Sequence, residues 1–256
     1  MSEVMNTQKT AERSTPARVS DPGDAHSESP VSRRLVVKAA LTLPVLGVIG
    51  CARITADSAA PVQPIFFDAA ERKFIDAATQ RLIPDGDDGL GAKAARVGEF
   101  IDRQLAGVYG RAATWYMQGP WKKGTPEQGY QLALTPAELY RTAIRAIDGH
   151  CQDSYGQVFA ALAPAEQDKL LHELEKGELE LPDTSAKEFF DMLLKNTQEG
   201  FLADPLYGGN RNFAGWRLIG FPGPRYNYVF EITQYGKPYP LPTVGLLGRN
   251  GNQVWS

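Results

Sequence analysis

A histidine and a cysteine that could form a thiol nucleophile stand side by side in the sequence. An imidazolium beside a thiol lowers the thiol's pKa, so His150 and Cys151 are the first candidates for chemistry. Successive helical residues point about 100° apart, however, and this geometry does not favour proton transfer between neighbours. The pattern favours Cys151 as a small buried hydrophobic residue.

Two further stretches resemble the beginnings of metal sites. His172-Glu173 starts like a His-Glu-x-x-His zinc helix, but Lys176 stands where the second histidine must be. Asp85 to Gly89 resembles the start of a calcium loop, but Arg96 occupies the twelfth place, where an EF-hand requires Glu. We therefore expect a solvated helix face at His172 and an acidic turn after Pro84.

The sequence lacks the motifs that bind common redox cofactors and the motif that carries the nucleophile of many hydrolases. There is no G-x-G-x-x-G for a dinucleotide, no Cys-x-x-Cys-His for covalent haem and no G-x-S-x-G nucleophile elbow. The sequence thus predicts no catalytic, cofactor-binding or metal-binding residue in this chain.

The composition is that of an ordinary globular protein. The 256 residues are 43% hydrophobic and 22% charged, which suits one domain preceded by a leader. The formal net charge of -3 and the lack of a basic cluster argue against nucleic acid as a partner.

The N-terminal region has the pattern of an export signal. Residues 1–31 are polar and without apolar periodicity, as in a disordered extension. The apolar run 39–50 follows a charged region and is shorter than the roughly 20 residues that span a bilayer. The paired arginines directly before this run indicate a twin-arginine signal, whose residues are Ser32, Arg33, Arg34 and Lys38.

The end of the signal allows two interpretations. Val48-Ile49-Gly50-Cys51 resembles a lipobox, in which Cys51 would be acylated and would anchor the protein to a membrane. Alternatively, cleavage occurs at small residues within 56–60.

Helical periodicity begins near Phe66. Apolar residues at three-to-four-residue spacing follow a capping box at Asp68, and a second helix begins near Ala92 and ends at Gly107 or Gly110. Three more helices are expected, opening at Thr135, at Pro164 and at a capping box that begins at Ser185.

The composition changes to Gly, Pro and aromatic residues after Gly200. This pattern predicts a folded Gly/aromatic-rich loop and then an extended arm, Tyr226 to Leu247, with room for short strands. We therefore predict a mainly α fold, with a leader in 1–60, a single helical domain in 61–205, and the loop and arm in 206–256.

The large side chains of the Gly/aromatic region suit two roles. They can cap the chain's own helices, or they can form a partner interface, because Trp, Tyr and Arg dominate interface hot spots. The candidate interface residues are Tyr207, Arg211, Phe213, Trp216, Phe221, Tyr226 and Tyr228.

Two blocks of sequence carry a family resemblance. They are FFDAAERKFIDAATQRLIPDGDDGLGAKAARVGEFIDRQLAG, Phe66 to Gly107, and the more specific QEGFLADPLYGGNRNFAGWRLIGFPG, Gln198 to Gly223. The pattern resembles the gluconate 2-dehydrogenase subunit 3 family, the small accessory subunit of membrane-bound, flavin-dependent sugar or polyol dehydrogenases. The resemblance extends from about Phe66 to Pro224.

The resemblance implies a role in an oxidoreductase complex rather than catalysis by this chain. In such a complex a large FAD-containing subunit oxidises the sugar and a multi-haem cytochrome c takes the electrons. The small subunit supports export through the twin-arginine translocase, maturation or stability, at the periplasmic face of the bacterial inner membrane. The alternative is a stand-alone periplasmic lipoprotein, or an enzyme with an unrecognised cofactor site.

Overall fold

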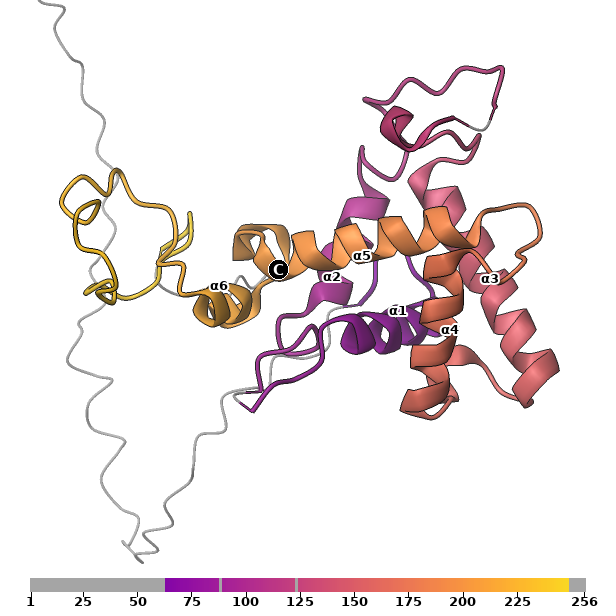
Figure 1. Ribbon diagram of the computed structural model, residues 1–256, viewed down its shortest axis with the longest axis horizontal. Coiled ribbons are helices and arrows are strands. Elements are labelled where there is room, and N and C mark those ends of the chain that lie inside the picture. Colours follow the sequence, from indigo (N-terminus) through magenta and orange to yellow (C-terminus); the bar gives the residue numbers. More distant parts are fainter. Residues whose placement is uncertain (1–62, 88, 123, 249–256) are drawn as a thin grey trace, which may run out of the picture. The chain divides into compact units, whose positions relative to one another are not determined.

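The computed structural model describes residues 63–87, 89–122 and 124–248, and the predicted leader lies outside them. These residues form six α-helices and four 3-10 turns without a strand, which confirms the predicted mainly α fold (Figure 1). The only pairing of β type among them is an isolated bridge between Gly245 and Gly248. The helices are α1 Ala69–Leu82, α2 Val97–Ala106, α3 Pro136–Tyr155, α4 Pro164–Lys176, α5 Ala186–Leu202 and α6 Ala214–Ile219. The 3-10 turns are η1 Pro126–Gln128, η2 Phe159–Ala161, η3 Pro205–Tyr207 and η4 Arg211–Phe213.

The helices begin at the capping residues predicted from the sequence, but the capping box predicted for α5 is incomplete. Reciprocal capping boxes form at Asp68 and at Thr135, so backbone N–H groups of the first turns of α1 and α3 have acceptors. At α5 only one half of the expected box is present, where Glu188 N–H donates to the Ser185 hydroxyl at 3.3 Å.

The expected start of the second helix near Ala92 is wrong. Residues 92–96 form turns, and α2 begins at Val97. Ala92 N–H donates to the carbonyl of Ile83 at 2.9 Å, and Arg96 adopts a left-handed backbone with φ of 55°. A left-handed residue cannot continue a right-handed helix, so the regular turns start only after it.

Helix α5 lies at the centre of the domain and contacts each of the other five helices (Figure 1). Aromatic rings fill the core around it. The ring centroids of Phe74 and Phe159 are 4.6 Å apart, and those of Tyr140 and Phe189 are 5.4 Å apart. Large rings contribute much of the apolar area removed from water in such a core. These two pairs of rings join α1 to η2 and α3 to α5.

A buried carboxylate fixes the segment that leads into α1. Asp102 on α2 is 3% exposed and accepts backbone hydrogen bonds from Ile65 at 2.7 Å, Phe66 at 3.0 Å and Phe67 at 2.9 Å. Arg141 on α3 donates to the carbonyl of Phe66 at 2.6 Å. These contacts join residues far apart in the sequence, so the segment is held in place only in the folded domain.

Candidate functional site

The two residues first considered for chemistry are neighbours on α3 that differ in burial, since His150 is half-buried and Cys151 is buried. Cys151 is fully buried in α3, as expected from the sequence, and burial together with the charge of Asp148 raises its pKa to about 11. A thiol with such a pKa is largely protonated at neutral pH and is a poor nucleophile. Cys151 therefore contributes packing.

The described residues of the two stretches that resemble metal sites make other contacts. His172 is exposed and lies 3.1 Å from Glu175, while Asp85 accepts hydrogen bonds from Gln80 at 2.9 Å and from Gly91 N–H at 3.1 Å. Across 63–87, 89–122 and 124–248, no three His, Cys, Asp or Glu residues are grouped so that they could hold a metal ion. The contacts at these two stretches are those of a solvated helix face and a turn.

A groove of about 920 Å³ lies between the loop before α3 and the start of α5. Its walls include Trp121 and Tyr130 on the loop and Lys187, Glu188 and Asp191 on α5. Burial, and then the charge of Asp191, raises the pKa of Glu188. The wall charges are mixed, so the groove lacks the single-sign field of a site for a charged ligand.

The Gly/aromatic region, by contrast, forms an ordered structure against the end of α5. Asn210 is fully buried, donates to the carbonyl of Ala203 at 2.8 Å and accepts from Gly215 N–H at 2.8 Å. Trp216 donates from its indole N–H to the carbonyl of Leu202 at 2.7 Å. Carbonyls at a helix end have no partner within the helix, so these side chains cap α5.

Close backbone approach explains two glycines of this region. A Cβ added at Gly209 would lie 2.1 Å from the carbonyl oxygen of Gly200, and one at Gly215 would lie 2.0 Å from that of Phe201. The Phe213 and Trp216 rings stack at 5.5 Å, and both are nearly buried. The backbone of this region therefore lies so close to the backbone of α5 that only glycine fits at these two positions.

The expected arm folds back on itself and forms a closed loop, residues 222–246, which we call the C-terminal loop (Figure 1). Val244 N–H donates to the carbonyl of Pro222 at 3.2 Å, and Arg225 donates to the carbonyl of Pro242. Asp204 accepts from Leu246 N–H at 2.8 Å and ties the end of the loop to the segment after α5.

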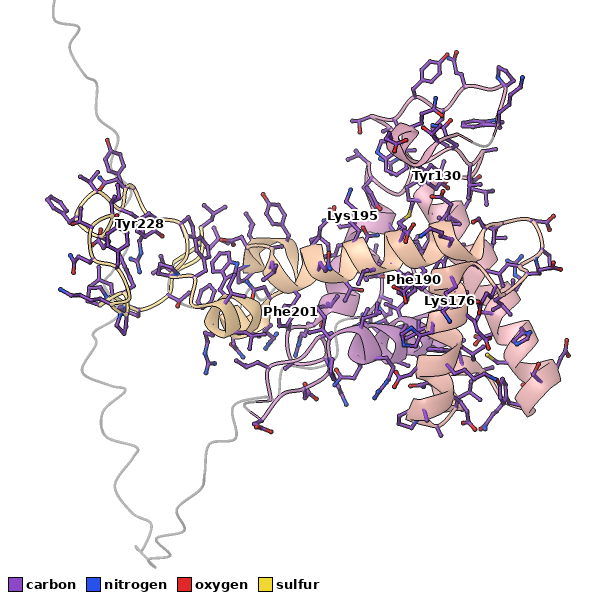
Figure 2. All side chains as sticks on the ribbon, viewed as in Figure 1. Tyr130, Lys176, Phe190, Lys195, Phe201 and Tyr228 are labelled. Atoms are coloured by element: carbon purple, nitrogen blue, oxygen red, sulfur yellow. The ribbon has the colours of Figure 1, made fainter. Side chains whose placement is uncertain are left out.

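Side chains inside the C-terminal loop hold its shape. Tyr228 lies in this loop (Figure 2). Its ring lies 5.7 Å from that of Tyr239, and the Arg225 guanidinium lies 5.2 Å from the Tyr239 ring centre. The Tyr228 hydroxyl donates to the carbonyl of Gly223. These contacts hold the loop in a defined shape.

Most of the exposed large hydrophobic side chains among the described residues belong to the C-terminal region. Of eighteen large hydrophobic side chains that are exposed, twelve lie between Tyr207 and Leu247. Apolar surface gathered in this way marks interaction sites in folded proteins.

The candidate interface residues divide into three groups by burial. Phe213 and Trp216 face their own chain, and Arg211 and Tyr228 are half-buried. Tyr207, Phe221 and Tyr226 are exposed. Four further exposed residues were not among the predicted interface residues, although their density within ten residues was a usable signal: Val229, Phe230, Ile232 and Tyr235.

The fold and surface define a small helical protein whose exposed large hydrophobic side chains lie mostly between Tyr207 and Leu247. Residues 69–223 match the family model for gluconate 2-dehydrogenase subunit 3, and the chain belongs to this family. Membership as a third subunit implies other dehydrogenase subunits as partners. No helix among the described residues is long and apolar enough to cross a membrane. Comparisons with curated proteins and with solved structures found no match.

Proposed function

We propose that this chain is a non-catalytic accessory subunit of a membrane-bound, FAD-dependent complex like gluconate 2-dehydrogenase. A large flavoprotein subunit oxidises the sugar, and a multi-haem cytochrome c subunit accepts the electrons. FAD and haem belong to those partners. This chain supports the export, maturation or stability of the flavoprotein.

The observation that carries the proposal is the apolar surface between Tyr207 and Leu247. A protein that worked alone would leave these side chains in water at a cost of about 25 cal/mol for each Å² of apolar surface. A dehydrogenase subunit can cover them. Tyr207, Phe221 and Tyr226 belong to this surface, so they are the sequence-derived interface residues available to a partner.

The leader gives the second part of the proposal. Ser32, Arg33, Arg34 and Lys38 address the chain to the twin-arginine translocase, which exports folded proteins. A flavoprotein bound to this chain then crosses with its FAD in place and reaches the periplasmic face of the bacterial inner membrane. Cys51, if acylated, adds a membrane anchor.

An export assay tests the proposal. The full chain is co-expressed with a flavoprotein subunit of the proposed complex, and the double variant Arg33→Lys, Arg34→Lys is compared with Arg13→Lys, Arg18→Lys in the same leader. We expect the first variant to leave both chains and the FAD in the cytoplasm, and the control to export them. Export of the flavoprotein with the first variant would contradict the proposal.

A further inference from the structure

The outer end of the C-terminal loop presents five large apolar side chains within ten residues. The exposed fractions are 102% for Tyr226, 62% for Val229, 80% for Phe230, 65% for Ile232 and 86% for Tyr235. We call residues 226–235 the loop tip. The match to the family ends at residue 223, so the tip lies beyond the matched region.

The area of the loop tip suits a protein interface. A buried aromatic side chain removes roughly 150–250 Å² from water, so three such rings supply at least about 450 Å². A standard interface covers about 800 Å² on each partner. The tip can therefore supply more than half of one side of an interface.

One charged residue interrupts this run of exposed apolar residues in the sequence. Glu231 lies between Phe230 and Ile232 and is half-buried. Its backbone N–H donates to the carbonyl of Tyr228, whereas its carboxylate makes no ion pair with another residue in the described part of the chain. A carboxylate covered by a partner needs a cation or a hydrogen-bond donor there.

We propose that the loop tip inserts into an apolar recess of a partner protein, where a Lys or Arg side chain pairs with Glu231. This inference rests on the proposed function, because the partner is the flavoprotein subunit. Asp204 is a positioning residue, since its bond to Leu246 N–H holds the loop to the domain.

A protein fits the loop tip better than a lipid surface does. The contacts among Arg225, Tyr228 and Tyr239 order the loop. Because the loop is preorganised, it loses less conformational entropy when it binds a surface of fixed shape. A fluid bilayer does not need that order. Bacterial membranes also carry anionic headgroups, which repel the Glu231 carboxylate.

Charge reversal at the tip tests the proposal. The full chain is co-expressed with the flavoprotein, and complex retention is measured for Glu231→Lys and Phe230→Ser. The matched controls are Glu180→Lys, the same charge change at an exposed site, and Tyr116→Ser, which removes a ring that is 81% exposed outside the loop. We expect both tip variants to bind at least about tenfold more weakly and both controls to bind normally.

The outcomes separate this inference from the proposed function. Failure of the unaltered chain to retain the flavoprotein would overturn both. Retention that both tip variants leave unchanged would overturn the inference alone. Circular dichroism checks that the variants fold, and Ile232→Ser provides an independent third tip variant.

A lipid partner gives a different pattern. With vesicles of phosphatidylethanolamine and phosphatidylglycerol, we expect no binding that depends on Phe230. Vesicle binding that Phe230→Ser abolishes and Glu231→Lys strengthens would overturn the inference in favour of a membrane surface.

Discussion

The carboxylate of Asp204 accepts a hydrogen bond from the backbone N–H of Leu246 at 2.8 Å, across 42 positions of sequence. The same side chain accepts from Leu206 N–H at 2.9 Å and caps η3. One residue thus fixes both the exit from α5 and the return of the C-terminal loop. The loop's shape depends on the helical domain.

Asp204→Ala tests this dependence. We expect amide exchange at Leu246 and Val244 to become faster, because the acceptor that holds the loop end is lost, while the centre of α5 exchanges as before. The free energy of unfolding should fall by about 1 kcal/mol, the value of a typical hydrogen bond and cap. Unchanged exchange at Leu246 would show that the loop is held by other contacts.

Asp102→Ala tests how the segment before α1 is held. Three backbone N–H groups lose their acceptor, so we expect the free energy of unfolding to fall by about 2–4 kcal/mol in urea titrations. Asp153→Ala on the exposed face of α3 is the control and should change it by less than about 0.5 kcal/mol. Equal effects would contradict the described role of Asp102.

Two glycine substitutions should have opposite effects on stability. Gly209→Ala places a Cβ 2.1 Å from the carbonyl of Gly200, and we expect a loss of about 1–3 kcal/mol by thermal or urea unfolding. Gly149→Ala in α3 meets no atom within 4 Å and should stabilise the helix by up to about 1 kcal/mol. A harmless Gly209→Ala would mean that the Gly/aromatic region does not pack closely on α5.

The ion pair between α1 and α4 predicts a pH dependence. Arg81 donates two hydrogen bonds of 2.6 Å to the Asp168 carboxylate. The hydrogen bonding to Arg81 is the main reason why the pKa of Asp168 is lowered. A lowered acid pKa stabilises the fold above the unfolded-state pKa, and the gain is lost as pH falls through the folded-state value. Arg81→Met should therefore cost up to about 1 kcal/mol at pH 7 and almost nothing in strong acid.

The control for this pair is Arg145→Met, an exposed arginine of α3. Its effect on the free energy of unfolding should be small and independent of pH. A pH-independent loss with Arg81→Met would indicate that the arginine acts by packing alone.

Cys151 should react only after unfolding. With a pKa of about 11, roughly one thiol in a thousand is ionised at pH 8, and the sulfur is buried. A thiol reagent should modify the native protein far more slowly than the protein in urea. Rapid modification of the native chain would contradict the structural role of this cysteine.

Local sequence signals predicted the helices well where the decisive contacts were local. The capping residues Asp68 and Thr135 and the apolar spacing after them placed the starts of α1 and α3. The prediction for the start of α2 was wrong because the hydrogen bond from Ala92 N–H to the Ile83 carbonyl holds residues after α1 in turns. A contact of this kind leaves no periodic pattern in the sequence.

The candidate interface was harder to predict for a physical reason. The residues that fill an interior, such as Phe213 and Trp216, are of the same types as those that fill an interface. Only the fold separates them from Tyr226 and its exposed neighbours. The Asp204 carboxylate holds the end of the C-terminal loop by accepting a hydrogen bond from the distant Leu246 amide, and the sequence carries no signal for this contact.

The accessory role is tested most directly by purifying the complex from its native membrane and then separating its subunits. We predict that a flavin-containing polypeptide co-purifies with this chain, that flavin and haem absorbance stay with the partners after separation, and that this chain is colourless. A flavin or haem spectrum retained by the isolated chain, or purification without a flavoprotein, would contradict the account.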